Sequence, residues 1–524
     1  MTKKPIIWSI SGSDCSGGAG IAADIKTGHG LGVEVCTLIT ANTVQNSHQL
    51  ISINPTSIDI LQQQFDTLLH DKPPTAIKLG LIATLEQATW LVTIIKQLKE
   101  QSPELIVVYD PVGQASVGGN FNTLSIQDLV PLLTQVDVIT PNLIEAKTLA
   151  KAHLLKDDNV NSLAESIYQS YGINSIIIKG GHSDDSDQCL DFCYHQLNQI
   201  KQDNQDKLHQ VIRYQLTSPR IATHYSHGGG CSYATALTAF LVLGYLIRDA
   251  FTLTKAFINQ GLNATKAVST HENHQYYGAF EQEHSPFDSI DAVKYFPKVV
   301  DEINQKNSHL PPFNSLNLQG EKLGLYPVID SIEWLKRLLP LGLKIIQLRV
   351  KNLVHSELEQ VIIEAINLAK NSNTRLFIND YWQLAIKHGA YGVHIGQEDL
   401  LEADLAKIQL AGVRLGISTH GSYEFLLAQQ LQPSYLAIGA IFPTKTKDMT
   451  GQIQGIDNLQ QLLTLMPAKP KQAISVVAIG GINFERAPEV LATGVDSIAV
   501  VTAITKASNP EQAATKLANL TTLY

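Results

Sequence analysis

Residues 324–504 contain eight short apolar runs, which read GLYPVID (324–330), KIIQLRV (344–350), RLFIND (375–380), GVHIGQ (392–397), RLGIST (414–419), YLAIGAIF (435–442), SVVAIGG (475–481) and SIAVVTAI (497–504). Each run is flanked by sequence of helical character and breaks into polar or small residues at its C-terminal end. Near-continuous Val, Ile and Leu runs that alternate with helices predict a parallel sheet. Eight such units predict a closed TIM (β/α)8 barrel.

Polar residues gather where these predicted strands end, which is where a barrel of this kind builds its active site. They are Arg349, Lys351, Asn379, Asp380, Asp399, Ser418, Lys447 and the pair Gly480–Gly481. A single Asp at a strand end is often only a helix cap, and a Gly pair can be a plain turn. Two Asp together with three cations on one rim favour a site for a diphosphate and a metal ion.

The first half of the chain has a different α/β pattern. Its apolar runs are IIWSISG (6–12), VCTLITA (35–41), AIKLGLI (76–82), LIVVYDP (105–111), VDVITPN (136–142) and SIIIKGG (175–181). Two further runs, at 190–195 and 211–217, flank a polar segment and predict a hairpin or edge pair. The pattern predicts an open, doubly wound α/β/α sheet whose ligands bind beyond the carboxyl ends of the strands.

Composition excludes several classes of protein. The chain has 524 residues, enough for two or three domains, and 44% of them are hydrophobic. The net charge of −9 argues against a nucleic-acid surface or a polybasic membrane patch. Five scattered cysteines without a CxxC pair predict neither a disulfide framework nor a zinc ribbon, and they favour a cytoplasmic protein. The start lacks a signal-peptide pattern, and the apolar stretch 234–247 is short enough to be a buried helix.

The composition also suggests where the domains divide. We expect an N-terminal domain at 1–270 and the barrel at 323–524. Residues 271–322 are polar and contain prolines, so we expect a linker with one helix near 290–305.

Two glycine-rich stretches of the first half are candidate ligand loops. SGSDCSGGAGIAADIK (11–26) follows the first predicted strand and places Asp24 one turn into a helix, but it matches neither a Walker loop nor GxGxxG. HGGGCSYATALTAFLVLG (227–244) runs from three glycines into an apolar helix. Backbone N–H groups at such a helix start suit a phosphoryl anion. We expect the helix dipole to favour the thiolate of Cys231, although a lone Cys is often only a small core residue.

Taken together, SGSD (11–14), GIAADIKT (20–27), VQN (44–46), DPV (110–112), TPNLIEA (140–146), IKGGH (178–182) and GGGC (228–231) are similar in order and spacing to motifs of the hydroxymethylpyrimidine/phosphomethylpyrimidine kinases. Those enzymes are ribokinase-like, and the resemblance covers about residues 5–270. It implies a kinase that uses ATP and Mg²⁺ to phosphorylate the pyrimidine alcohol and then its monophosphate.

The same resemblance implies roles for matching residues. Gln45 and Asp24 would bind the aminopyrimidine, Asp110 and Glu145 would organise Mg²⁺ and the phosphates, and Lys179 would lie near the nucleotide phosphates. In addition, Cys231 would be the general base and Gly228, Gly229 and Gly230 would stabilise the transferring phosphoryl group. Gly229, Gly113 and Leu81 depart from the residues common in the family (Thr, Met and Met), but the base and the acidic pair are present.

The barrel resembles thiamine phosphate synthase over about residues 320–524. The matching segments are QLRVK (347–351), IND (378–380), GVHIGQED (392–399), GIST (416–419), PTKTK (443–447), AIGGI (478–482) and AVVTAI (499–504). The resemblance implies that the barrel joins hydroxymethylpyrimidine diphosphate to a thiazole phosphate, which releases diphosphate and gives thiamine phosphate.

Here too the residues suit the reaction. Arg349, Lys351 and Lys447 would neutralise the leaving diphosphate, and Asp380 and Asp399 would bind Mg²⁺. The other expected substrate contacts are Gln347, Asn379 and Ser418 for the pyrimidine diphosphate, Thr444 and Thr446 for the thiazole, and Gly480, Gly481, Val501 and Thr502 for its phosphate. We expect His394 to be a packed residue rather than a ligand. Val350 stands where the family usually has Glu, and strand alternation should point it away from Arg349 and Lys351.

The sequence therefore predicts a bifunctional enzyme of thiamine biosynthesis that acts on small molecules, binds neither nucleic acid nor membrane, and forms a homo-oligomer. Two alternatives stay open. The kinase half could prefer a pyridoxine-type alcohol, since pyridoxal kinases share the fold, although Gln45 and Cys231 argue against this. One half could instead be a ligand-binding regulator without catalysis.

Overall fold

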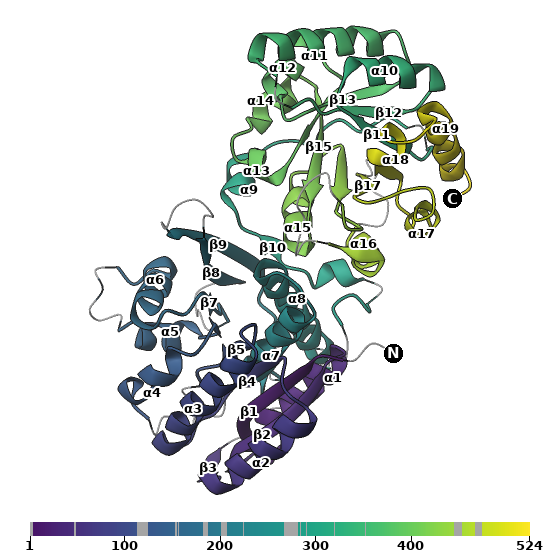
Figure 1. The fold of residues 1–524 in the computed structure, drawn as a ribbon. Helices are drawn as coiled ribbons and strands as arrows, with labels where there is room; N and C mark the ends of the chain where they lie inside the picture. Colours follow the sequence, from purple (N-terminus) through teal and green to yellow (C-terminus); the bar gives the residue numbers. More distant parts are fainter. Residues whose placement is uncertain are drawn as a thin grey trace. The chain divides into compact units, whose positions relative to one another are not determined.

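A computed structural model describes residues 4–46, 49–112, 124–151, 155, 157–181, 187–200, 207–223, 225–266, 281–282, 285–289, 291–318, 320–351, 353–444, 453–466 and 474–524. The chain forms two compact units, Met1–Lys298 and Val299–Tyr524. Each unit contains one large sheet with its own helices (Figure 1).

The first unit is built on a ten-stranded sheet in the order β10-β9-β8-β7-β6-β5-β4-β1-β2-β3. The strands are β1 (Ile6–Asp14), β2 (Glu34–Gln45), β3 (Leu50–Pro55), β4 (Ala76–Leu79), β5 (Ile106–Tyr109), β6 (Val138–Ile139), β7 (Ser175–Ile178), β8 (Gln188–Ile200), β9 (Lys207–Pro219) and β10 (Lys298–Val299). Strands β1, β2 and β4–β7 pair in parallel. β8 and β9 form the predicted antiparallel hairpin, and β3 pairs antiparallel with β2.

Helices cover both faces of this sheet, as predicted. They are α1 (Gly20–Gly30), α2 (Ile58–Asp71), α3 (Leu85–Gln101), α4 (Ile126–Leu133), α5 (Leu143–Leu149), α6 (Val160–Tyr171), α7 (Gly229–Val242) and α8 (Ile247–Lys266). Helices α1, α7 and α8 pack together on one face, while α2–α6 share a buried apolar core with the other face. Strand β1 lies between β4 and β2, so the strand order reverses there. This switch point is where doubly wound sheets bind ligands.

The second unit is the predicted barrel, with eight parallel strands closed in sequence order. They are β11 (Gly324–Ile329), β12 (Ile345–Leu348), β13 (Arg375–Asn379), β14 (Gly392–Ile395), β15 (Arg414–Thr419), β16 (Tyr435–Ile438), β17 (Ser475–Ile479) and β18 (Ser497–Val500). All eight coincide with the apolar runs of the sequence. The last strand pairs with the first, Tyr326 with Ala499, which closes the ring.

Helices surround the barrel (Figure 1). They are α10 (Ile332–Leu338), α11 (His355–Lys370), α12 (Trp382–His388), α13 (Gln397–Leu400), α14 (Leu405–Leu410), α15 (Ser422–Gln430), α16 (Gly455–Thr464), α17 (Ala487–Ala492), α18 (Thr502–Thr505) and α19 (Pro510–Thr521). The interior is packed with aromatic and branched side chains, among them Tyr326, Phe377 and Tyr435. The interior of the barrel is thus a packed core, so a ligand can bind only at the ends of the strands.

The segment expected as a linker is divided between the two units, and the single helix predicted near 290–305 is wrong. In its place are a short 3₁₀ turn, η3 (Ala292–Lys294), the strand β10 and the helix α9 (Glu302–Asn307). Pro297 explains the difference, because proline has no N–H and its ring disrupts the preceding helical turn. Asp301 then caps α9 by accepting a hydrogen bond from Ile303 N at 2.8 Å.

Residues 313–317, which we call the floor strap, lie across the N-terminal ends of the barrel strands. Phe313 N donates to Gln432 O at 3.0 Å, and Arg414 Nε donates to Ser315 O at 2.9 Å. Arg375 Nε and the Tyr391 hydroxyl both donate to Leu316 O, at 2.8 and 2.9 Å. The strap therefore closes the end of the barrel opposite the candidate site.

Removing the Leu316 side chain is expected to destabilise the barrel without changing its catalysis. Leu316 is 2% exposed and packs into the interior core with Leu323 and Tyr326. Leu316→Ala should lower the free energy of unfolding by about 2–5 kcal/mol, measured by urea unfolding, with the activity predicted for the barrel as a second readout. Leu410→Ala, at a position 86% exposed in the same unit, is the control. A lowered kcat for Leu316→Ala in the absence of urea would contradict a purely structural role.

Candidate active sites

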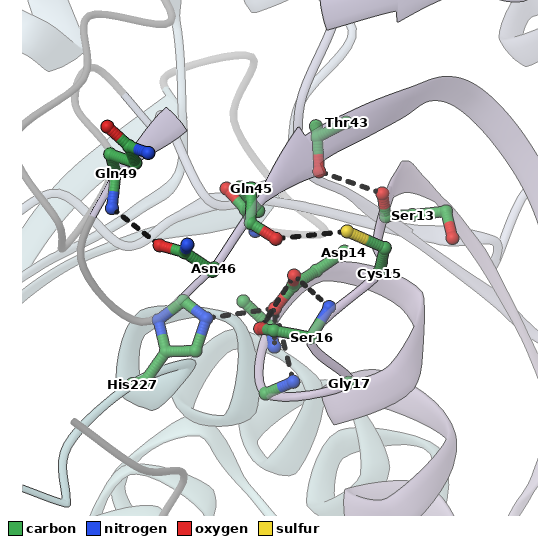
Figure 2. A network of polar contacts seen from close by, with 12 residues as sticks. Ser13, Asp14, Cys15, Ser16, Gly17, Thr43, Gln45, Asn46, Gln49 and His227 are labelled. Carbon is green, nitrogen blue, oxygen red and sulfur yellow. Dashed lines mark hydrogen bonds and ion pairs between the residues drawn. The ribbon is translucent and has the colours of Figure 1, made fainter. Parts of the chain in front are cut away.

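The first candidate site lies at the carboxyl ends of β1, β4, β5 and β7, where the start of α7 packs against the strands. Its organising residue is Asp14, the last residue of β1, which is 6% exposed. The Asp14 carboxylate accepts hydrogen bonds from Ser16 N at 2.8 Å, Gly18 N at 3.1 Å and Ala19 N at 2.9 Å. His227 Nε2 lies 2.8 Å from the same carboxylate (Figure 2). One side chain thus joins the loop after β1 to the segment before α7.

These contacts control the ionisation of Asp14. Burial alone would raise its pKa, but hydrogen bonds from His227, Gln45 and Ser16 outweigh burial and hold the pKa well below its usual range. The carboxylate is therefore charged throughout the neutral range. The residues alone did not identify Asp14 as a site residue, because its partner His227 is distant in the sequence.

Asp14→Asn is expected to destabilise the loop after β1 and the segment before α7, which the Asp14 carboxylate joins. Because the pKa of Asp14 is depressed in the folded state, its stabilisation is present above the unfolded-state pKa of about 3.9 and is lost as pH falls through the folded pKa. The variant should therefore cost the first unit roughly 1.5–3 kcal/mol at pH 7, and the difference from wild type should shrink below about pH 4. Chemical unfolding at pH 7 and pH 3.5 measures this, with Asp66→Asn on the exposed surface of α2 as control; an equal difference at both pH values would contradict it.

Close backbone packing positions the glycines before α7. Gly228 has φ of 81°, and a β-carbon there would lie 1.9 Å from Gly18 O. Any side chain at position 228 would push the two loops apart. Helix α7 begins at Gly229, so two of the three glycines lie inside the helix that the sequence predicts to follow them, and Gly229 N donates to Ser226 O at 3.1 Å. The three glycines therefore do not all offer a free N–H group to an anion, which corrects the simple anion-hole expectation.

Cys231 lies in the first turn of α7 and is partly exposed. The expectation of a favoured thiolate is wrong for this structure. Burial raises the pKa of the thiol to about 11, and Asp24 and Asp110 add to the rise, although Lys78 and a hydrogen bond from Gly20 oppose it. The cost of desolvating the thiolate outweighs the favourable effect of the helix dipole at the start of α7. Next to it, Ser232 accepts a hydrogen bond from Gln282 Nε2 at 2.6 Å, so the predicted linker contributes to this site.

Lys179 and Asp110 come together as predicted. Lys179 Nζ lies 3.0 Å from Asp110 Oδ1, and both side chains are largely buried. A β-carbon on Gly230 would lie 3.3 Å from Asp110 Oδ2, which places the pair beside the start of α7. Burial lowers the pKa of Lys179, but Asp110 and Glu145 outweigh it and raise the pKa above its usual value. The ammonium group is therefore charged and available to phosphate oxygens.

Glu145 has a second role in the structure. Its carboxylate accepts from Asn142 N at 2.8 Å, while Asn142 accepts from Glu145 N at 2.9 Å. This reciprocal pair is a capping box at the start of α5. Its predicted contact with Mg²⁺ and phosphate stays a prediction.

Asp24 is placed in a closed cluster rather than on an open surface. It is fully buried, forms an ion pair with Lys78 at 2.9 Å, and accepts hydrogen bonds from Ser9 at 2.5 Å and Thr235 at 2.7 Å. Lys78 was not predicted as a site residue; a lysine inside the apolar run AIKLGLI was the available signal. Asp24 holds Lys78 near Cys231, and its direct contact with substrate stays a prediction.

Gln45, at the end of β2, has an unused acceptor. The residue is 7% exposed, and no described residue forms a hydrogen bond with its side-chain oxygen Oε1. Its backbone oxygen accepts from Cys15 Sγ at 3.0 Å (Figure 2). A buried oxygen without a partner is costly unless a ligand donates to it. This fits the predicted contact with an amino group.

The second candidate site lies at the carboxyl ends of the barrel strands. Asp380 follows β13 with φ of 66°, and Asn379 donates to its carboxylate. Burial and the nearby Asp399 raise the pKa of Asp380 to about 6, while Arg349 and Lys351 oppose the rise. The structure therefore brings all four predicted charges together. Val350, at 7% exposure, is buried away from its charged neighbours, as alternation predicts.

The two carboxylates suit a divalent cation. They are hard oxygen ligands, and the repulsion that raises the pKa of Asp380 is the kind that a bound cation relieves. Among the residues that the structure describes, no group of three or more His, Cys, Asp or Glu side chains is placed to hold a metal. A metal here would need substrate oxygens or water to complete its shell.

His394 is a packed residue, as predicted. It is 6% exposed, and its ring nitrogens lie 2.7 Å from the Tyr435 hydroxyl and 2.8 Å from the Ser418 hydroxyl. Burial lowers the pKa of His394 to about 3. Gln347, also predicted, is 4% exposed and donates to the Tyr326 hydroxyl at 3.3 Å.

The remaining predicted residues lie around β16, β17 and β18. Gly480 and Gly481 follow β17 with φ of 104° and 63°, and Gly480 O accepts from Phe442 N at 3.0 Å. Strand β18 pairs with β17, so Val501 and Thr502 follow at the neighbouring strand end. Thr444 is described and partly buried. Thr446 and Lys447, like Gly113, lie outside the described residues.

No helix in the described part of the chain is long and apolar enough to span a membrane. The apolar stretch after Gly230 is the buried helix α7, in agreement with the sequence-based prediction.

Comparison with known proteins assigns both units. Residues 14–276 match the family model described as phosphomethylpyrimidine kinase. Residues 325–504 match the model described as thiamine monophosphate synthase.

Two thiamine-phosphate synthases agree with the second of these matches. The thiamine-phosphate synthase of Yersinia pestis strain Pestoides F is 56% identical over 200 residues, which are 38% of this chain and 91% of that protein. The thiamine-phosphate synthase of Salmonella typhimurium is 54% identical over 196 residues, 37% of this chain and 90% of that protein. A solved structure of Staphylococcus aureus pyridoxal kinase with ADP has 27% identity and a TM-score of 0.46, and covers 57% of this chain and 98% of its own. The chain thus belongs to the phosphomethylpyrimidine kinase family through residues 14–276 and to the thiamine monophosphate synthase family through residues 325–504, and it unites two transferases of thiamine biosynthesis in one polypeptide.

Proposed function

We propose that the first unit uses ATP to phosphorylate 4-amino-5-hydroxymethyl-2-methylpyrimidine and then its monophosphate. The barrel then joins the resulting diphosphate to thiazole phosphate, which gives thiamine phosphate and releases diphosphate. The observation that carries this proposal is the presence of both family matches on one chain. Because the two units are covalently joined, the intermediate is made at a raised local concentration near its consumer.

In the kinase step, the substrate hydroxyl attacks the γ-phosphorus while the bond to the leaving ADP breaks. Gln45 Oε1 would accept a hydrogen bond from the pyrimidine amino group, since this oxygen has no partner among the described residues. Lys179 would neutralise charge on the phosphates, and Cys231 would accept the hydroxyl proton. The raised thiol pKa means that this base works only after it loses its own proton, which Lys78 favours.

Both sites would use Mg²⁺, which supplies positive charge that the phosphate groups need. Asp110, with Glu145, would hold it with ATP in the kinase. Asp380 and Asp399 would hold it in the barrel. The electrostatic coupling between these last two carboxylates supports the barrel assignment.

In the barrel, the C–O bond to the diphosphate would break with its electron pair leaving on oxygen. The aminopyrimidine ring shares the positive charge left on the methylene carbon, and the thiazole nitrogen then forms the new C–N bond with its lone pair. Arg349, Lys351 and Lys447 would stabilise the departing anion. The other contacts that we propose are Gln347, Asn379 and Ser418 to the pyrimidine diphosphate, Thr444 and Thr446 to the thiazole, and Gly480, Gly481, Val501 and Thr502 to its phosphate.

A one-pot assay tests the whole proposal. The purified chain receives ATP, Mg²⁺, hydroxymethylpyrimidine and thiazole phosphate, and thiamine phosphate is detected by mass. We expect product from this mixture. If thiamine phosphate forms only when the pyrimidine diphosphate is supplied directly, the kinase assignment is wrong. If it forms in neither case, a regulatory role is favoured. Comparing turnover of hydroxymethylpyrimidine and pyridoxine addresses the remaining alternative. A homo-oligomeric, cytoplasmic protein stays a prediction.

A further inference from the structure

Five polar side chains form one hydrogen-bonded chain across the inside of the barrel. Gln347 Nε2 lies 3.3 Å from the Tyr326 hydroxyl, which lies 2.7 Å from the Tyr435 hydroxyl. Tyr435 then meets His394 Nδ1 at 2.7 Å, and His394 Nε2 meets the Ser418 hydroxyl at 2.8 Å. The chain begins on β12 and crosses through β11, β16 and β14 to end on β15. We call it the cross-barrel chain.

The cross-barrel chain has a direction, because each hydroxyl carries one proton. The Gln347 amide nitrogen can only donate, so Tyr326 accepts from it. Either tyrosine could donate to the other, but only donation from Tyr326 to Tyr435 gives the Tyr326 proton an acceptor within the chain. Tyr435 in turn donates to His394 Nδ1, which leaves the proton of a neutral imidazole on Nε2, facing Ser418. A protonated imidazole would direct the same N–H at Ser418, so the last link does not depend on the charge of the ring.

The two ends therefore present opposite hydrogen-bonding groups. Gln347 turns its amide nitrogen to Tyr326 and gives it one of its two protons, while its oxygen is an acceptor. Ser418 has accepted from His394, so its own proton is available to an acceptor. A 4-aminopyrimidine offers an amino donor beside a ring-nitrogen acceptor, and its attached diphosphate offers further acceptors. Both ends of the chain suit that ligand.

We propose that Tyr435 is a positioning residue that fixes this direction and so makes the barrel selective for an aminopyrimidine over an oxo-pyrimidine. The inference rests on the proposed function of the barrel and deepens it. Tyr435 does not need to touch the substrate; it acts through His394 and Ser418 on one side and through Tyr326 and Gln347 on the other. It is the central link, so loss of its hydroxyl separates the two halves of the chain.

The packing of Tyr435 allows that hydroxyl to be removed cleanly. The ring is fully buried and makes edge contacts with Phe377 and Tyr326, at centroid distances of 5.1 and 5.7 Å. Gly416 gives it room, because a β-carbon there would lie 2.2 Å from Tyr435 Cζ. Tyr435→Phe keeps these contacts and removes only the oxygen that joins Tyr326 to His394.

The test compares binding of two ligands to the full chain: the aminopyrimidine diphosphate and its 4-oxo analogue, in which the donor and acceptor of that edge are exchanged. Dissociation constants are used because the analogue also changes the reactivity of the ring. We expect wild type to prefer the amino ligand. Tyr435→Phe should reduce that preference by roughly tenfold or more, because a buried hydrogen bond is lost and the hydrogen bond between Ser418 and His394 becomes free to reverse its direction.

Tyr391→Phe is the matched control, because it removes another tyrosine hydroxyl from the same barrel, one that donates to Leu316 O outside the chain. Its preference should equal that of wild type. Tyr326→Phe breaks the chain one link earlier and should shift the preference in the same direction as Tyr435→Phe, which keeps the test decisive if one variant folds poorly.

Unchanged preference in both chain variants, or an equal change in the Tyr391→Phe control, would overturn the inference. In that case a wild type that still makes thiamine phosphate leaves the proposed function intact. If wild type itself makes no thiamine phosphate from the pyrimidine diphosphate, the proposed function of the barrel fails, and this inference fails with it.

Discussion

Replacing Asp380 by Ala is expected to lower kcat/KM of the condensation by about a thousandfold while leaving the kinase at its wild-type rate. Asp380 is the carboxylate whose pKa burial and Asp399 raise to about 6, beside Arg349 and Lys351. Without it, the leaving diphosphate loses the cation that Asp380 helps to hold, and removal of one electrostatic group from a site of this kind costs about 10²–10³ in rate. Both activities are measured on the same purified chain.

The Mg²⁺ dependence distinguishes a metal ligand from a structural residue. If Asp380 helps to bind the ion, Asp380→Ala should require more Mg²⁺ for half-maximal synthase activity, and Asp399→Ala should show the same shift. Glu364→Ala, which removes an exposed carboxylate paired with Lys336 in the same unit, is the control and should change neither quantity. An unchanged Mg²⁺ requirement in both Asp variants would exclude them as ligands.

Cys231→Ala is expected to abolish kinase turnover and to spare the synthase. The sulfur lies at the start of α7, within electrostatic reach of Lys78, Asp24 and Asp110, and general-base assistance is typically worth 10²–10⁴ in rate. Cys36→Ala, which removes a partly exposed thiol from β2 of the same unit, is the matched control. Synthase activity of the variant reports that the rest of the chain is intact.

A pH profile gives this prediction a second readout. A base with a pKa of about 11 is almost fully protonated at neutral pH. As long as the pH stays below the pKa, the deprotonated, active fraction rises tenfold for each unit by which the pH increases. Kinase kcat/KM should therefore climb with slope one between pH 7 and 9.5, and Cys231→Asp should flatten the profile, because an ionised carboxylate does not titrate there. If Cys231→Ala or Asp380→Ala silenced both activities in a folded protein, the division into two sites would be wrong.

The sequence predicts some parts of this molecule far better than others. All eight barrel strands coincide with continuous apolar runs, because strands buried on both faces leave no other pattern. Strand β3 was not expected, since LISINP is short, ends in proline and has residues that are all partly or fully exposed. The helix predicted near 290–305 is wrong because Pro297 interrupts the segment. Local composition predicts buried strands well and exposed edge strands poorly.

Sequence-based prediction has the same limit for the charged residues of the two candidate sites. The sequence places Asp110, Lys179, Asp380 and Arg349 at strand ends. The structure brings Asp110 to Lys179 in the first unit and Asp380 close to Arg349 in the barrel. The pair Asp24–Lys78 joins residues 54 positions apart, and Asp14 meets His227 across 213 positions, so no local motif reveals either pair. The pKa of Cys231 could not be read from its place at a helix start, because burial depends on elements distant in the sequence.

The floor strap has a consequence for the history of the chain. A gene fragment that starts at residue 325, where the synthase family match begins, would encode all the barrel strands except the first residue of β11. It would lack Leu316 and Leu323, which pack against the interior core. Arg375, Arg414 and Tyr391 would also lose the backbone oxygens that they bind. The smallest gene fragment that encodes a stable synthase therefore begins before Phe313. That position lies within residues 271–322, the segment that the sequence predicts to be a linker. The part of this segment that follows Lys298 already belongs to the second enzyme.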